Sequence, residues 1–137
     1  MSLVLDCSAT LAWIYPDETT DAIREVFDLI QARGCSAPAL WRLEVANSLT
    51  ISIRRRRTSP AFRADALNVL ALLPISIDPE TDAHAWTATL QLADRFGLTL
   101  YDAAYLELAQ RRSLALASLD AQMRRAAQAL QLETLGL

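Results

Sequence analysis

The sequence of 137 residues contains no lysine, a single histidine and only three glycines. Without lysine, every mechanism that depends on a lysine amine is excluded. One histidine, His84, cannot build a zinc site that needs several histidines. The glycines form neither G-x-x-x-x-G-K-[ST] nor G-x-G-x-x-G, so the glycine-rich loops that bind nucleotide phosphates are absent. These absences remove several enzyme classes before any fold is considered.

Cysteine and long apolar runs are also scarce. The two cysteines, Cys7 and Cys35, are too few for a disulfide scaffold, and we expect both to be small buried apolar groups. The first residues carry Asp6 and no basic leader, which is not typical of a signal peptide. No run approaches 18 apolar residues without a charge, so we expect no membrane span and a cytoplasmic protein.

The composition favours one compact domain over residues 1–137. Hydrophobic residues make up 53% of the chain, which is enough to bury a core. The net charge is −3, and all 13 basic residues are arginines. Because the chain is not basic as a whole, contact with a nucleic acid would have to come from local arginine patches.

Short apolar segments alternate with longer segments of helical periodicity. The apolar segments predict strands at 3–5, 35–38, 74–77, 114–118 and 132–135. The others predict helices at 8–15, 18–32, 39–55, 60–72, 78–96, from 99 onward, and at 120–130. This alternation predicts a three-layer α/β/α fold with a short-stranded, mainly parallel sheet covered on both faces. In such folds the functional crevice lies beyond the carboxyl ends of the strands.

Acidic residues stand where that crevice is expected. Asp6 directly follows the first strand, and Asp120 lies two residues past the fourth. Asp102 opens a helix, and Glu44 lies in the first turns of the helix that follows the second strand. The fold could therefore bring the four side chains into one pocket.

Each of these acids also has a structural interpretation. Asp6 and Asp120 suit the N-cap of a following helix, and Asp102 forms a capping-box pattern with Thr99. Glu44 and Asn47 instead interrupt an otherwise apolar helix face, so we expect Asn47 to be a polar neighbour of the site. A buried acid without a partner is costly, and a metal ion would remove that cost.

Four segments together resemble the PIN-domain proteins, especially the ribonuclease toxins of the VapC type. The segments are 4–8 with Trp13 and 16–18, then 37–49, 98–109 and 116–120. They occur in the family's order and cover essentially the whole chain. The resemblance implies a metal-dependent endoribonuclease of PIN-like fold. It implies an acidic site of Asp6, Glu44, Asp102 and Asp120, with Ser8 and Ser118 as hydroxyl partners.

The resemblance also implies partners. A toxin of this kind would cleave RNA, bind a cognate antitoxin that blocks its pocket, and form a homodimer. The RNA could be transfer, ribosomal or messenger RNA.

Physical chemistry favours a divalent cation in such a pocket. Three or four crowded carboxylates repel one another. Mg²⁺ or Mn²⁺, which prefer oxygen ligands, would relieve that repulsion, acidify a water molecule and neutralise a phosphate. The sequence leaves open whether one ion or two would bind.

The densest charge run is Arg54, Arg55, Arg56 and Arg57. It has two interpretations: a solvated helix end that complements the dipole, or a contact with RNA phosphates. We expect the pairs 111–112 and 124–125 to be solvated, and Trp13, Trp41 and Trp86 to pack in the core or an interface.

Two other functions remain as alternatives. Residues 6–10 distantly resemble the D-x-D-x-T motif of haloacid-dehalogenase-like phosphotransferases, with Asp6 as the nucleophile. The second aspartate and the lysine of that class are missing. The chain could also be a catalytically silent PIN fold that serves as a binding module.

Overall fold

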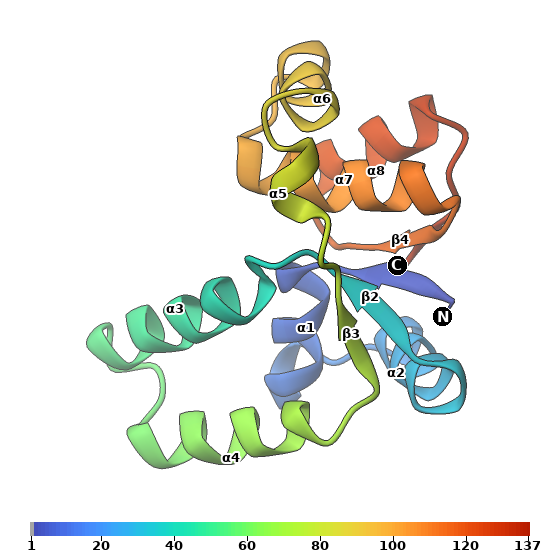
Figure 1. Cartoon of the computed structure of the whole chain (residues 1–137). Helices are drawn as coiled ribbons and strands as arrows, with labels where there is room; N and C mark the ends of the chain where they lie inside the picture. Colours follow the sequence, from blue (N-terminus) through green and yellow to red (C-terminus); the bar gives the residue numbers. More distant parts are fainter. Residues whose placement is uncertain (1) are drawn as a thin grey trace.

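The computed structural model describes residues 2–137 and builds them around a five-stranded parallel sheet (Figure 1). The strands lie in the order β3-β2-β1-β4-β5, and all four pairings are parallel. Their bounds are β1 Leu3–Leu5, β2 Cys35–Ala37, β3 Ile75–Ile77, β4 Ala115–Ala117 and β5 Thr134–Leu135. The expected short-stranded parallel sheet is confirmed.

Strand β1 lies at the centre of the sheet and of the core. Its three residues are fully buried, as expected of an apolar run covered on both faces. Val4 is paired with Ser36 of β2 on one side and with Leu116 of β4 on the other. The chain therefore leaves β1 with a fixed direction, and Asp6 follows at the carboxyl edge.

Helices cover both faces of the sheet. Figure 1 shows α5 to α8 on one side and α1 to α4 on the other. The bounds are α1 Cys7–Ile14, α2 Asp21–Arg33, α3 Trp41–Arg54, α4 Pro60–Ala71, α5 Thr81–His84, α6 Ala88–Phe96, α7 Leu100–Arg112 and α8 Ala121–Ala129. Within the described residues, no helix is long and apolar enough to cross a membrane. The predicted three-layer α/β/α fold is confirmed.

Two predicted helices differ from the structure. The helix expected over 78–96 is interrupted after α5, because Thr87 has φ −121° and ψ −99°, outside the helical region. Trp86 lies at this interruption and is 87% exposed, so it does not pack in the core, and its packing in an interface stays a prediction. The helix expected from 18 begins at Asp21, because Pro16–Glu18 form a separate 3-10 turn and Thr20 caps α2 through the N–H of Ile23.

The other two tryptophans pack as expected. Trp13 stacks on Phe27 with the ring centroids 4.3 Å apart. Trp41 is buried at the start of α3, and its indole N–H donates to the Thr10 hydroxyl at 3.1 Å. This contact anchors the N-terminal end of α3, and with it Glu44, against α1.

Candidate active site

The four predicted acids line one cleft of about 260 Å³. Its lining consists of Asp6, Cys7, Ser8, Leu11, Glu44, Ser48, Asp102, Tyr105 and Asp120. Asp6 follows β1 and Asp120 follows β4, and between these neighbouring strands the strand order reverses. A crevice at such a reversal is the usual ligand site of an open parallel sheet.

Hydrogen bonds from neighbouring residues hold the Asp6 carboxylate in place. Its Oδ1 accepts the backbone N–H of Ala9 at 2.9 Å, which caps α1, and the Ser8 hydroxyl at 2.7 Å. The residue is only 5% exposed. Burial raises the pKa of Asp6 to about 6, and the charge of Asp102 adds to the rise, while these hydrogen bonds oppose it.

Ser8 and Ser118 connect the ends of β1 and β4. The Ser8 hydroxyl accepts the backbone N–H of Leu119 at 2.9 Å, and Ser118 accepts that of Asp120 at 3.1 Å. The two hydroxyl oxygens lie 3.5 Å apart, and Ser118 is fully buried. The predicted hydroxyl residues therefore hold the loop that carries Asp120 against the loop that carries Asp6.

Glu44 reaches the cleft from α3 and meets a tyrosine of α7. The Tyr105 hydroxyl donates to Glu44 Oε1 at 2.7 Å. Burial and the charge of Asp102 raise the pKa of Glu44, although the Tyr105 hydrogen bond opposes this. Burial, together with its bond to Glu44, raises the pKa of Tyr105 far above its usual value, so its hydroxyl remains a donor.

Asp102 and Asp120 close the cleft from the starts of two helices. Asp102 lies in the first turn of α7, which Thr99 caps by accepting the Asp102 N–H at 3.1 Å. Asp120 caps α8 by accepting the N–H of Met123 at 2.8 Å. Burial raises the pKa of Asp102, and the charge of Asp120 adds to this rise. The capping interpretation of Asp6 and Asp120 and their place in the cleft are therefore both correct.

The cleft has an excess of negative charge. No arginine or histidine within residues 2–137 forms an ion pair with any of the four acids. In the described conformation, no three histidine, cysteine, aspartate or glutamate side chains of this stretch converge closely enough to enclose an ion. The donor set is nevertheless all oxygen. It fits Mg²⁺ or Mn²⁺ bound through one or two carboxylates with water completing the shell, as Mg²⁺ prefers, and it does not fit a closed protein cage.

Residues 3–129 match the family model of the PIN domain. The chain belongs to the PIN-domain family. It is 30% identical over 123 residues to Ribonuclease VapC3 of Pyrobaculum aerophilum, a match that covers 90% of this chain and 92% of that protein. The resemblance inferred from the four segments is confirmed.

Solved structures show the same PIN fold. The crystal structure of PAE2754 from Pyrobaculum aerophilum has a TM-score of 0.71 at 24% identity, over 98% of this chain and 83% of that one. The crystal structure of VapBC2 from Rickettsia felis, bound to a DNA fragment from its promoter, has a TM-score of 0.68 at 13% sequence identity. The match covers 99% of this chain and 100% of that one. The crystal structure of FitAcB from Neisseria gonorrhoeae has a TM-score of 0.67 at 13% sequence identity, and the match covers 98% of this chain and 96% of that one.

Two residues at or near the cleft of this PIN domain lie differently from what the sequence predicted. Asn47 is exposed and does not line the cleft; Ser48, one residue further along α3, lines it instead. Cys7 was expected to be buried, but it is partly exposed in the cleft, where its sulfur lies 3.7 Å from the Ser48 hydroxyl. Burial raises the pKa of the Cys7 thiol to about 12, so it is not a thiolate nucleophile.

The arginine run divides into two parts. Arg57 is paired with Glu18 at 3.0 Å and Asp17 at 3.6 Å, and its guanidinium lies 3.9 Å from the centroid of the Tyr15 ring. It therefore fixes the turn after α3 to the turn after α1. Residues 54–56 are exposed and form no ion pair within the described chain.

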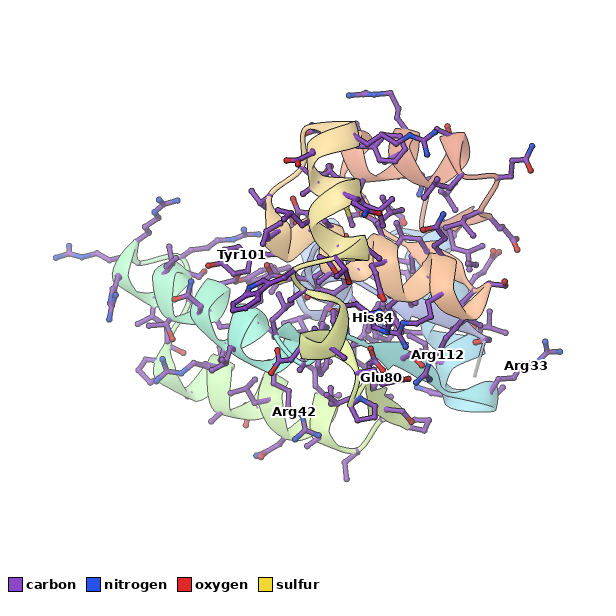
Figure 2. The ribbon with its side chains drawn as sticks, turned by 45° about the horizontal axis from the view of Figure 1, so that its top comes forward. Arg33, Arg42, Glu80, His84, Tyr101 and Arg112 are labelled. Atoms are coloured by element: carbon purple, nitrogen blue, oxygen red, sulfur yellow. The ribbon has the colours of Figure 1, made fainter. Side chains whose placement is uncertain are left out.

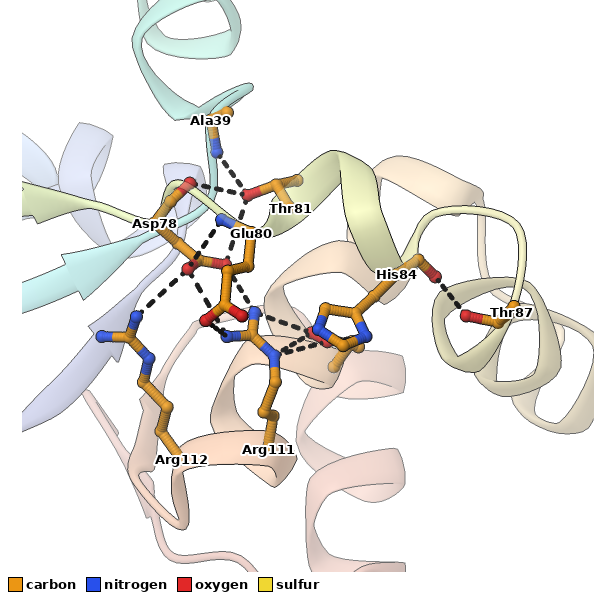
Figure 3. A network of polar contacts seen from close by, with 9 residues as sticks. Ala39, Asp78, Glu80, Thr81, His84, Thr87, Arg111 and Arg112 are labelled. Atoms are coloured by element: carbon orange, nitrogen blue, oxygen red, sulfur yellow. Dashed lines mark hydrogen bonds and ion pairs between the residues drawn. The ribbon is translucent and has the colours of Figure 1, made fainter.

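A second polar network lies outside the cleft, and sequence reasoning missed it (Figure 3). Asp78, whose side chain is fully buried after β3, is paired with Arg111 and Arg112 of α7. Arg111 also binds the buried Glu107, which lies 3.7 Å from His84. Figure 2 shows His84 and Arg112 close to Glu80, with Tyr101 apart from them.

The expectation of solvated arginine pairs on α7 and α8 is therefore wrong for three residues. Arg111 and Arg112 are only partly exposed and are both paired with Asp78. Arg124 donates to the backbone carbonyls of Ser118 and Leu135 at 2.8 and 2.9 Å. These charges stabilise the ends of β3, β4 and β5. Arg125 is exposed, as expected.

Proposed function

We propose that this PIN domain is a metal-dependent endoribonuclease that acts as the toxin of a toxin–antitoxin pair. One observation carries the proposal: four carboxylates share a cleft at the reversal of strand order, with no positively charged partner among the described side chains. The 30% identity to a ribonuclease over nine-tenths of the chain supports RNA as the substrate. The same family match argues against the haloacid-dehalogenase-like alternative, in which Asp6 would be a nucleophile.

Asp6, Glu44, Asp102 and Asp120 would hold the cation, Mg²⁺ or Mn²⁺. When bound, the cation supplies an acidified water molecule and neutralises the charge of the phosphodiester. Asp6 is oriented by its hydrogen bonds to Ala9 and Ser8, which would hold its carboxylate ready for ligation. Because burial raises the pKa of Asp6 to about 6, a cation would have to compete with a proton for this carboxylate below that pH. Ser8 and Ser118 keep Asp6 and Asp120 at one edge of the cleft.

The arginines of residues 54–56 are the part of the run that could meet RNA. They are exposed at the C-terminal end of α3, the helix that carries Glu44 at its other end. An RNA strand in the cleft could follow α3 and place phosphates near these guanidinium groups, which bind phosphate well. Arg57 is already occupied by Glu18 and Asp17.

Two protein partners follow from the family. A cognate antitoxin would block the cleft by placing a basic side chain among the four acids, where the charge is unbalanced. A second copy of the chain would form a homodimer. The expected location is the cytoplasm, where RNA and an antitoxin would both be available.

The proposal is tested by RNA cleavage with purified protein. Wild type is assayed on structured RNA with Mg²⁺ or Mn²⁺, and again after complete chelation. Asp6→Asn, Glu44→Gln and Asp102→Asn should each remove most of the cleavage. The double variants should lose little more, because the acids act as one unit.

Two outcomes would overturn the proposal. Activity that survives complete chelation contradicts metal dependence. A folded wild type that binds RNA but never cuts it, with either metal, supports the alternative of a catalytically silent binding module.

A further inference from the structure

We infer that the Tyr105 hydroxyl positions Glu44 for cation binding by joining α7 to α3 across the cleft. The inference rests on the proposed function and adds to it a residue that holds no cation itself. Tyr105 was not among the residues predicted for the site. Its ring does pack in the core, at 1% exposure, but its hydroxyl points to the cleft.

The geometry makes this hydrogen bond the link between two acids. Tyr105 donates to Glu44 Oε1 at 2.7 Å, across 61 residues of sequence. Asp102 precedes Tyr105 by three residues on α7, so both side chains lie on one face of that helix. The bond therefore fixes the place of Glu44 relative to Asp102, and both acids would hold the cation.

The bond also selects an oxygen. With Oε1 held by Tyr105, Oε2 is the Glu44 oxygen with no donor among the described residues, and it is free to face a cation or its water. No other side chain among residues 2–137 donates to this carboxylate, so without Tyr105 the glutamate would be free to change rotamer in its half-buried position. Hydrogen-bonding partners of metal ligands commonly change metal affinity 10–100-fold when they are removed.

The test measures Mn²⁺ affinity in the absence of RNA, by titration with electron paramagnetic resonance detection of free Mn²⁺. Tyr105→Phe keeps the buried ring and removes only the hydroxyl, so circular dichroism should show an unchanged fold. We expect its Mn²⁺ dissociation constant to rise about 10–100-fold.

Tyr15→Phe is the matched control. Tyr15 is the other buried tyrosine, at 5% exposure, and it does not line the cleft. Its hydroxyl makes no hydrogen bond with a described residue, so Tyr15→Phe should bind Mn²⁺ as wild type does.

A double-variant cycle then separates positioning from a general structural effect. If Tyr105 acts through Glu44, then Tyr105→Phe should cause no further loss of Mn²⁺ affinity in a Glu44→Ala background. An equal loss in both backgrounds, or wild-type affinity in Tyr105→Phe, would overturn the inference and leave the proposed function standing. Failure of wild type itself to bind Mn²⁺ would instead contradict the proposed function.

Discussion

Asp6 is the most deeply buried of the four cleft acids, and its burial makes a charge there costly. Its pKa rises from 3.8 to about 6 in the folded protein, so the folded state holds this proton more tightly than the unfolded chain does. The stabilisation is therefore complete below about pH 4 and is lost as the pH rises through 6. The shift corresponds to about 3 kcal/mol at most.

We therefore expect metal-free wild type to lose stability between pH 4 and pH 7 more steeply than Asp6→Asn. Asparagine removes the titration and still suits an N-cap. Urea unfolding in chelator at several pH values measures both slopes. Glu44 and Asp102 titrate in both proteins, so the difference isolates Asp6. Equal slopes of the free energy of unfolding against pH in the two proteins would show that ionising Asp6 does not destabilise the folded state.

Single residues show what the sequence could and could not predict about the cleft. Asp6 and Asp120 were predictable because both closely follow strands whose carboxyl ends share one edge. Asn47 does not line the cleft although it is three residues after Glu44, because Ser48, four residues after Glu44, is an equally close helical neighbour and only packing decides which one faces the cleft. Tyr105 was missed because its partner Glu44 lies 61 residues away and on another helix.

At the scale of the element, α3 has one end at the cleft and the other in solvent. If residues 54–56 contact RNA phosphates, replacing all three arginines with glutamine should weaken RNA binding and flatten its salt dependence. On single-stranded RNA, the slope of log affinity against log salt should fall by about 0.7 for each phosphate that the variant no longer neutralises. Binding curves of Glu44→Gln protein at several salt concentrations measure this without cleavage.

Arg57→Gln is the control on the same run. Arg57 is paired with Glu18 and Asp17, so its substitution should leave the salt slope unchanged and affect the turn after α3 instead. A triple variant with wild-type affinity and slope would restore the interpretation of residues 54–56 as a solvated helix end.

Helix α7 carries Asp102 at its start and Arg111 near its end. Arg111 neutralises the buried Asp78 and Glu107, and Arg111→Leu would leave both acids short of a partner. We expect a loss of about 3–5 kcal/mol in the free energy of unfolding, measured in urea. Arg125→Leu, on the exposed face of α8, should change it by less than about 0.5 kcal/mol. Equal effects would mean that the network does not stabilise α7.

This network also shows the limit of element-level prediction. Asp78 precedes a proline, which favours a helix start, and Arg111 lies near a helix end, where arginine is normally solvated. Each local interpretation is reasonable, but the two residues are 33 positions apart and meet only because α7 packs against the loop after β3. The interruption between α5 and α6 has a local cause, the non-helical backbone of Thr87, but it was not predicted because the apolar spacing across it is continuous.

At the scale of the whole molecule, alternation of apolar strands and helices was enough to predict a parallel sheet with two covered faces. The strand order β3-β2-β1-β4-β5 could not be predicted from periodicity, because it depends on which strands pair after the chain has crossed the sheet. That order is what creates the crevice between β1 and β4. It brings acids separated by over a hundred residues into one cleft of about 260 Å³.

The central claim is that these acids form one cation site, and melting curves of wild type and Asp102→Asn, in chelator and in millimolar Mn²⁺, test it most directly. Cation at tenfold its dissociation constant should stabilise wild type by about 1.4 kcal/mol, or roughly 3–6 °C. Asp102→Asn should lose most of this shift, because one ligand is gone. A full shift in the variant, or none in wild type, would contradict the claim.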